Sequence, residues 1–170
     1  VAADLLAQAE HGVGSVVALV TDSVVLADDV EALVSLGLEG AGEVGLVLVA
    51  DPSEALAVCD AFAPEHLQLM GPTMERLADS VTRAGCTFVG SSTGVAFGDY
   101  IVGSNHTLPT AGAARFASVL SGRTFRRLTS LVQLDEAAAS DLAEAAIPIA
   151  DAEGFTLHAA SMRLRQNQTP

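Results

Sequence analysis

The chain of 170 residues contains no lysine and no tryptophan, and only 4% of its residues are aromatic. Its eight basic residues are all arginines, against 21 aspartates and glutamates, so the formal net charge is −13. A polyanion of this kind has no electrostatic attraction to nucleic acid or to an anionic membrane surface. We therefore expect no nucleic-acid partner and no membrane partner, and a core built mainly from Ala, Val and Leu.

Long apolar runs and cysteines are also scarce. No run of about 18 apolar residues is present, so no transmembrane helix is expected. The chain opens on Val1 with neither the basic nor the apolar region of a signal peptide. The two cysteines, Cys59 and Cys86, do not make a disulfide framework and fit a reducing compartment. These features predict a cytoplasmic protein.

Short β-branched apolar runs alternate with helical segments along the first half of the chain. The predicted strands cover residues 15–21, 43–50 and 86–89, and the predicted helices cover residues 1–10, 28–36, 51–61 and 73–83. The start of the third helix is typical, with Asp51 as the N-cap and Pro52 at the first helical position. Strands separated by helices of this length favour parallel βαβ units.

The pattern changes after residue 89. Residues 90–112 are rich in Gly, Ser, Thr and Asn, and we expect a long irregular loop, which in a compact domain is often functional. Beyond it we expect a strand at 130–134, a long Ala-rich helix from Asp135 to about Glu153, and a last helix at 155–165. The predicted organisation is an α/β part over residues 1–130 and a helical part over residues 131–170.

Two pairs of polar side chains in the first half are candidates for chemistry. Gln8 and His11 are three residues apart at the end of a helix, so they share one face and suit a metal, although a histidine there also caps a helix against its dipole. Glu65 and His66 follow a helix and the stiff Pro64, and these residue types serve as general bases near neutral pH. The alternative for the second pair is a surface turn.

Three further segments carry candidates in the second half. Asp99 and His106 lie among glycines, which let a backbone approach a ligand closely, or they belong to a structural loop with Asx turns. Glu153 and His158 flank Gly154 at a junction of two helices, where a lone histidine is also a common surface residue. Gln8, His11, Asp99 and His158 together offer nitrogen and oxygen donors compatible with zinc.

Five segments resemble histidinol dehydrogenase, in the order and at the spacing of that family. They are residues 3–11 (ADLLAQAEH), 61–69 (AFAPEHLQL), 98–110 (GDYIVGSNHTLPT), 114–116 (ARF) and 152–158 (AEGFTLH). The resemblance implies an α/β fold with an incomplete Rossmann-like parallel sheet, flanking helices and a C-terminal helical dimerisation segment. It also implies oxidation of L-histidinol to L-histidine, through L-histidinal, by a zinc- and NAD-dependent homodimer.

The resemblance assigns roles to individual residues. The zinc ligands would be Gln8, His11, Asp99 and His158, with His158 supplied by the partner subunit. His66 would take the alcohol proton and Glu65 would activate water, while Glu153 would bind the substrate's amino group. The implied substrate-binding residues are Gln8, His11, His66, Asp99, Glu153 and His158, and His106 would line the pocket.

The sequence also departs from the family. Its chains are more than twice as long, so we expect this chain to be a C-terminal fragment that lacks most of the NAD-binding residues and the strands ahead of Val1. Residues 91–97 (SSTGVAF) lack the Pro-Glu pair that often precedes the Gly-Asp-Tyr motif. Three readings remain: a fragment of the enzyme, a non-catalytic zinc-binding or dimerisation module that has lost activity, and a metal-dependent hydrolase.

Overall fold

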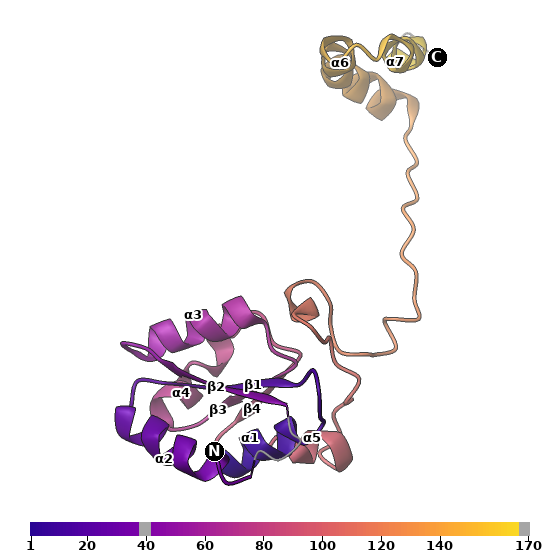
Figure 1. Cartoon of the computed structure of the whole chain (residues 1–170). Helices are drawn as coiled ribbons and strands as arrows, with labels where there is room; N and C mark the ends of the chain where they lie inside the picture. The colour runs from indigo at the N-terminus through magenta and orange to yellow at the C-terminus, as the bar shows by residue number, and fades with distance from the viewer. Residues whose placement is uncertain (38–41, 167–170) are drawn as a thin grey trace. The chain divides into compact units, whose positions relative to one another are not determined.

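The computed structural model describes residues 1–37 and 42–166 of the chain. The chain forms two compact units, Val1–Arg126 (unit 1) and Arg127–Pro170 (unit 2). Both appear in Figure 1. None of the helices in the described ranges is long and apolar enough to cross a membrane.

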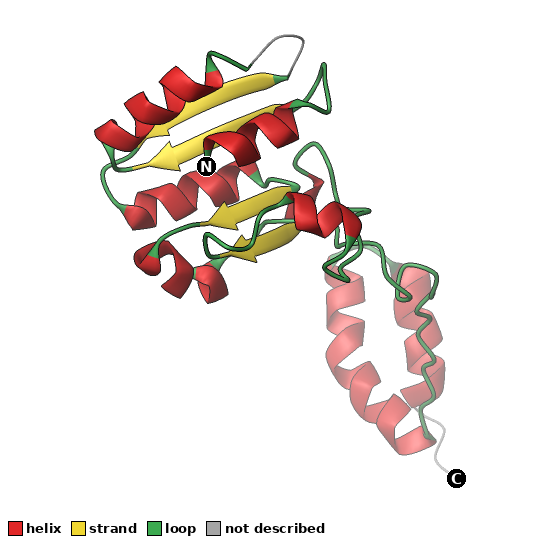
Figure 2. Cartoon of the chain, turned by 90° about the horizontal axis from the view of Figure 1, so that it is seen from below, coloured by secondary structure: helices red, strands yellow, loops and turns green. Residues whose placement is uncertain are grey.

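Unit 1 contains short parallel strands connected by helices. Its elements are α1 (Ala2–Ala9), β1 (Val16–Thr21), α2 (Val24–Val34), β2 (Glu43–Leu48), α3 (Pro52–Phe62), β3 (His66–Leu69), α4 (Pro72–Arg76), η1 (Ala78–Ser80), β4 (Cys86–Val89), α5 (Ala96–Tyr100) and η2 (Ala113–Arg115). Strand β1 pairs with β2 and β3 with β4, both in parallel, so the described residues form two separate two-stranded sheets. All four arrows point the same way in Figure 2. The predicted α/β class with parallel strands is confirmed.

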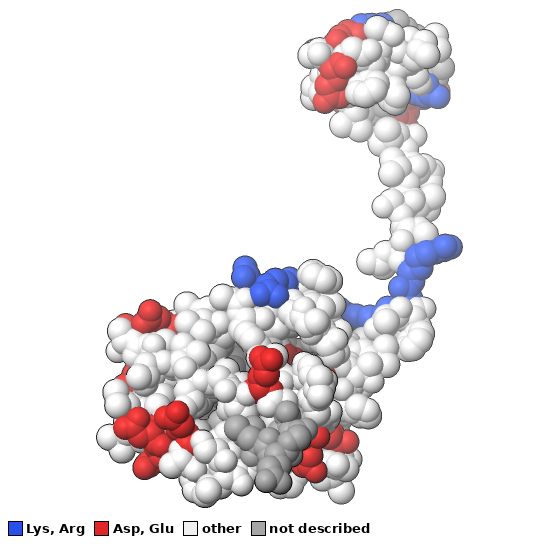
Figure 3. Space-filling view, in the orientation of Figure 1, with Lys and Arg blue, Asp and Glu red and all other residues white. Residues whose placement is uncertain are grey.

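The helices cover both faces of the strands. Figure 1 shows α3 on one side of the sheets and α1 and α2 on the other. The buried side chains between these layers are small or aliphatic apart from one ring, as the composition predicts; they are Ala9, Ala27, Val30, Val34, Ala55, Ala63, Leu67, Leu69, Phe88 and Val95. Figure 3 shows that acidic side chains spread over the visible face of unit 1, whereas basic ones gather in a few places.

Side-chain caps determine where the helices begin. Asp51 accepts hydrogen bonds from the backbone N–H groups of Ser53 (2.8 Å) and Glu54 (3.0 Å), which confirms the predicted start of α3. Ser23 caps α2 in the same way through the N–H of Leu26 (3.2 Å). The prediction that this helix begins at residue 28 is therefore wrong by four residues. The Ser23 cap starts the helix within the apolar, strand-like run of residues that follows it.

The helix predicted over residues 73–83 is also too long. Helix α4 ends at Arg76, a 3-10 turn follows at Ala78–Ser80, and the chain then leaves helical geometry. At the end of the predicted range, the carboxylate of Asp60 in α3 accepts hydrogen bonds from the backbone N–H groups of Thr82 (3.2 Å) and Arg83 (3.1 Å). These two N–H groups are therefore not available for helical hydrogen bonds, and they bind α3 to the segment before β4.

Unit 2 is a hairpin of two helices, α6 (Glu136–Ala152) and α7 (Thr156–Gln166). Asp135 caps α6 through the N–H of Ala138 (2.8 Å), and Gly154, with φ of +79°, makes the turn between the helices. Both predicted helices are confirmed. The core of the hairpin consists of Ala143, Ile147, Ala150 and Ala159, with Met162 packed against them.

The strand predicted over residues 130–134 is wrong. No described strand pairs with this segment, which has no regular structure, and the side chain of Leu131 is 92% exposed. A β-branched apolar run becomes a strand only when a neighbouring strand accepts its backbone hydrogen bonds, and the described part of the chain offers none.

Candidate active site

The Glu65–His66 pair lies at a sharp change in chain direction between α3 and β3. Helix α3 ends at Phe62, and the fully buried Ala63 adopts the left-handed conformation (φ 55°, ψ 64°) that is usual for glycine after a helix. The backbone carbonyl of Glu65 accepts a hydrogen bond from the N–H of Cys86 (2.9 Å). The pair is thus held at the beginning of β3, where His66 is the first strand residue, and not in the surface turn that was the alternative for it.

His66 faces the carboxylate of Asp99. Its Nε2 lies 3.9 Å from Asp99 Oδ1, and the two side chains are 13% and 25% exposed. Asp99 belongs to α5, a short helix inside the segment for which the sequence predicts only irregular structure. That expectation is wrong over residues 96–100, and the helix is what presents Asp99 to His66.

The loop before α5 is anchored to the same sheet. Gln68, two residues after His66, donates from Nε2 to the backbone oxygen of Thr93 (3.1 Å). The Thr93 hydroxyl in turn donates to the backbone oxygen of Val89 at the end of β4 (2.7 Å). These two hydrogen bonds fix the entry to α5 relative to both strands of the sheet.

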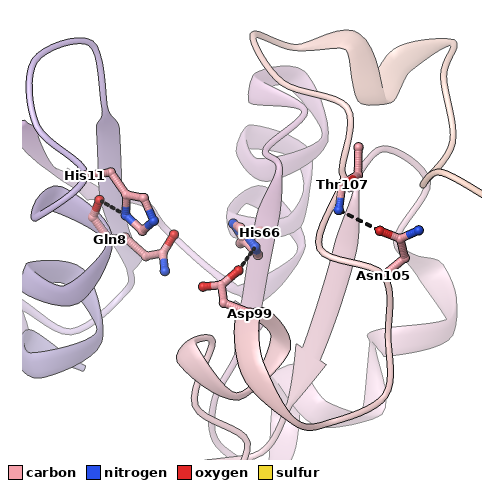
Figure 4. Close-up of polar contacts among 6 residues, drawn as sticks. All are labelled: Gln8, His11, His66, Asp99, Asn105 and Thr107. Carbon is pink, nitrogen blue, oxygen red and sulfur yellow. Dashed lines mark hydrogen bonds and ion pairs between the residues drawn. The ribbon is translucent and has the colours of Figure 1, made fainter.

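Gln8 lies in α1, whereas His11 lies in the turn two residues beyond the end of that helix, so the expectation that the two share one helix face is wrong. Helix α1 packs against α5, and Figure 4 shows the Gln8 carboxamide directed toward Asp99 and His66. His11 Nδ1 lies 3.1 Å from the backbone oxygen of Gln8. If Nδ1 carries the proton of that hydrogen bond, Nε2 is left as a free lone pair, which is the usual state of a metal-ligating histidine.

The donor set of unit 1 suits zinc in its chemistry, because it offers a carboxamide on α1, an imidazole in the turn after α1, and a carboxylate on α5. Within residues 1–37 and 42–166, however, no three His, Cys, Asp or Glu side chains come close enough to hold a metal by themselves.

The remaining candidates are His106 in unit 1 and Glu153 and His158 in unit 2. His106 is exposed, and its neighbours form an Asx turn in which Asn105 Oδ1 accepts from the N–H of Thr107 (2.8 Å, Figure 4). In unit 2, Glu153 ends α6 and His158 lies in the first turn of α7, where its ring packs 5.3 Å from that of Phe155. Both Glu153 and His158 are exposed.

The two cysteines take no part in this group. Burial, and then the negative charge of Asp60, raise the pKa of the Cys59 thiol, and burial raises the pKa of Cys86. Both thiols are unpaired and stay protonated at neutral pH, so neither is activated as a nucleophile or as a metal ligand.

Three further residues pack around the site, and their spacing in the sequence does not indicate this role. Phe88 of β4 packs its ring 5.9 Å from the ring of His66, and Gly98 packs against Phe88. The Arg115 guanidinium donates to the backbone oxygens of Ala61 and Phe62 at the end of α3. Gly98 and Arg115 lie in motifs that the sequence analysis quotes, but their partners become visible only in the fold.

Comparison with known proteins identifies the family. The sequence model of the histidinol dehydrogenase family matches residues 1–166. The chain belongs to the histidinol dehydrogenase family. All eight candidate residues considered above, from Gln8 to His158, lie within the matched segment.

Individual relatives agree with this membership. The chain is 44% identical over 176 residues to a histidinol dehydrogenase of Parasynechococcus marenigrum, covering 97% of this chain and 40% of the relative. It is 42% identical over 183 residues to that of Corynebacterium glutamicum, covering 100% and 41%. A crystal structure of histidinol dehydrogenase from Elizabethkingia anophelis is similar with a TM-score of 0.75 at 30% identity, covering 96% of this chain and 40% of that one. The chain thus spans about two fifths of the length of these histidinol dehydrogenases.

Proposed function

We propose that the chain supplies the zinc- and substrate-binding part of a cytoplasmic L-histidinol dehydrogenase of histidine biosynthesis, which oxidises L-histidinol to L-histidine through L-histidinal. This proposal is supported by the approach of His66 to Asp99, with α1, which carries Gln8, packed against α5, in a chain whose residues 1–166 match the family model. Family membership favours this chemistry over that of a metal-dependent hydrolase.

In this proposal Gln8, His11 and Asp99 hold zinc together with His158 of a second subunit in a homodimer. When bound, zinc fixes the nitrogen atoms of the substrate and NAD accepts hydride at each oxidation. The Nδ1 contact of His11 with the Gln8 carbonyl orients the ring so that Nε2 is the ligating atom. His158, exposed on α7, is free to reach another protein surface.

His66 and Glu65 then move protons. His66 accepts the hydroxyl proton of the alcohol in the first oxidation, and the nearby Asp99 carboxylate stabilises the imidazolium that results. Glu65, beside it on the chain, removes a proton from the water that adds to the aldehyde. Glu153 binds the amino group of the substrate through its carboxylate.

We further propose that another stretch of polypeptide completes unit 1 and brings most of the NAD site. A parallel sheet is normally buried on both faces and has several strands. Here each described sheet has two strands, and Val16 (52% exposed), Leu48 (54%) and Val89 (38%) expose apolar surface. The chain spans only about 40% of the length of its relatives. The additional strands and the NAD site can therefore come from polypeptide that corresponds to the unmatched part of those relatives.

A chimera tests the proposed function. This chain replaces the matched segment of the Corynebacterium glutamicum relative, and NADH formation is followed with L-histidinol and zinc. We expect turnover that falls at least about 100-fold in His66→Ala, the scale of a lost general base. Arg123→Ala, which removes an exposed side chain outside the proposed machinery, is the control and should change turnover less than about threefold.

The outcomes separate the alternatives. A folded, NAD-binding chimera that does not oxidise L-histidinol would refute the proposal and favour the non-catalytic module. The 170-residue chain alone is expected to produce no NADH, because most of the NAD site lies elsewhere. Turnover by the isolated chain would contradict that part of the proposal.

A further inference from the structure

Helix α5 lies unusually close to the sheet that carries His66. Gly98, which is buried, is the contact point: a Cβ atom placed on it would lie 2.6 Å from Cζ and 3.0 Å from Cε1 of Phe88. Its φ is not in the left-handed region, so the backbone there does not require glycine. The residue is needed for its missing side chain, which leaves space for the Phe88 ring.

Phe88 transmits this contact to His66. In the register of the parallel pair, His66 lies opposite Cys86 and Gln68 opposite Phe88, so His66 and Phe88 share one face of the sheet. The ring of Phe88 is 3% exposed and lies 5.9 Å from the His66 ring with an interplanar angle of 41°. Phe88 is thus packed between the backbone of α5 and the imidazole.

The surroundings leave α5 little freedom to absorb a shift. The loop before α5 is bound to β3 through the hydrogen bond between Gln68 and Thr93, and α5 itself packs against α1. A methyl group at Gly98 must therefore either push α5 away from the sheet or turn the Phe88 ring toward His66. Both movements change the 3.9 Å separation between His66 Nε2 and Asp99 Oδ1.

We propose that Gly98 and Phe88 are positioning residues: the absence of a side chain at Gly98 lets α5 rest on the Phe88 ring, and this contact sets the approach of Asp99 to His66. The inference rests on the proposed function only in the consequence that a displaced Asp99 binds zinc less well. The geometric part stands without a metal.

Four variants of the 170-residue chain test the inference. Gly98→Ala introduces the clash, and Gly98→Ala combined with Phe88→Leu removes the ring atoms that the methyl group meets. Phe88→Leu alone reports the loss of the ring. Gly122→Ala is the matched control, because a Cβ there has nothing within 4 Å and its φ is ordinary.

The first measurement is the nuclear Overhauser contact between the His66 ring protons and the Asp99 β protons in the metal-free chain. We expect it in the parent chain and in Gly122→Ala, its loss in Gly98→Ala, and its return in the double variant. The second measurement is zinc affinity, which should fall about 10–100-fold in Gly98→Ala, the range for residues that orient metal ligands, and recover in the double variant.

The inference is overturned if Gly98→Ala keeps the His66–Asp99 contact, or if Phe88→Leu does not restore it while the fold, judged by circular dichroism, is intact. A chain that binds no zinc in any form would contradict the proposed function, and the metal-free measurement would still decide the role of Gly98 and Phe88.

Discussion

Arg115 should stabilise the end of α3 that leads into the Glu65–His66 pair. Its guanidinium donates from Nη1 to the backbone oxygen of Gly112 (2.9 Å) and from Nη2 to those of Ala61 and Phe62, the latter at 3.4 Å. The last carbonyls of a helix have no partner within it, and a cation there also opposes the negative end of the helix dipole. The Arg115 side chain therefore both donates hydrogen bonds to these carbonyls and places a positive charge at this end of the helix.

The expected cost of Arg115→Met follows from these contacts. A hydrogen bond to a charged group contributes about 1.5–3 kcal/mol when it is protected from water. Arg115 is exposed and solvent weakens its charge, so we expect a loss of about 1–2 kcal/mol for the whole set. In a unit of 126 residues this corresponds to a fall of about 3–8 °C in Tm.

The assay is chemical and thermal unfolding followed by far-ultraviolet circular dichroism. Arg123→Met is the matched control, because the Arg123 side chain is exposed and forms no hydrogen bond or ion pair with the described residues. Gly112→Ala should cost more than Arg115→Met, since a Cβ at Gly112 would lie 2.1 Å from Arg115 Nη1 and alanine is also strained at its φ of +76°. Equal stability of the Arg115→Met and Arg123→Met chains would refute the reasoning.

Three further substitutions test other parts of the structure by the same unfolding assay. Hydrogen bonds from Thr82 and Arg83 outweigh burial and hold the pKa of Asp60 below its ordinary value, so Asp60→Asn should cost about 1 kcal/mol at pH 7. Because the pKa of Asp60 is lowered in the folded state, its carboxylate stabilises the fold above the unfolded pKa near 4, and this stabilisation is lost as the pH falls. The difference in free energy of unfolding between the parent chain and Asp60→Asn should therefore vanish in acid. A difference that stays constant with pH would contradict this explanation. Ala63→Gly should be neutral or stabilising by up to about 1 kcal/mol, since it removes left-handed strain; a clear destabilisation would contradict it. Ile147→Ala should cost about 2–4 kcal/mol in the α6–α7 hairpin, and exposed Ile149→Ala less than about 1.

Local signals in the sequence predicted much of the fold. The Asp51-Pro52 start of α3 and the Asp135 start of α6 depend only on neighbouring residues, and both form as expected. The strands β1, β2 and β4 were predicted because they are short β-branched runs. The β3 strand was missed, since its four residues, His66–Leu69, contain two polar side chains and follow a proline turn.

The site was less accessible to sequence reasoning because it depends on contacts between distant segments. The pairing of His66 with Asp99 requires α5, and a helix of five residues in a glycine-rich stretch has no periodicity to detect. The backbone of Thr82 and Arg83 likewise hydrogen-bonds to Asp60, more than 20 residues earlier in the chain. The zinc ligands and catalytic roles came from family resemblance and stay predictions, as does the division of the chain near residue 130.

The proposal that His158 acts in a second subunit has a sharp consequence for mixtures of variants. His11→Ala and His158→Ala should each lose zinc binding and, in the chimera, turnover. In an equal mixture allowed to exchange subunits, about half of the dimers combine both variants, and one of the two sites in each such dimer has both histidines. About a quarter of the parent activity should therefore return, and it should grow with protein concentration. If His158 served its own subunit, no intact site would form in any dimer, and the mixture would stay as inactive as its components.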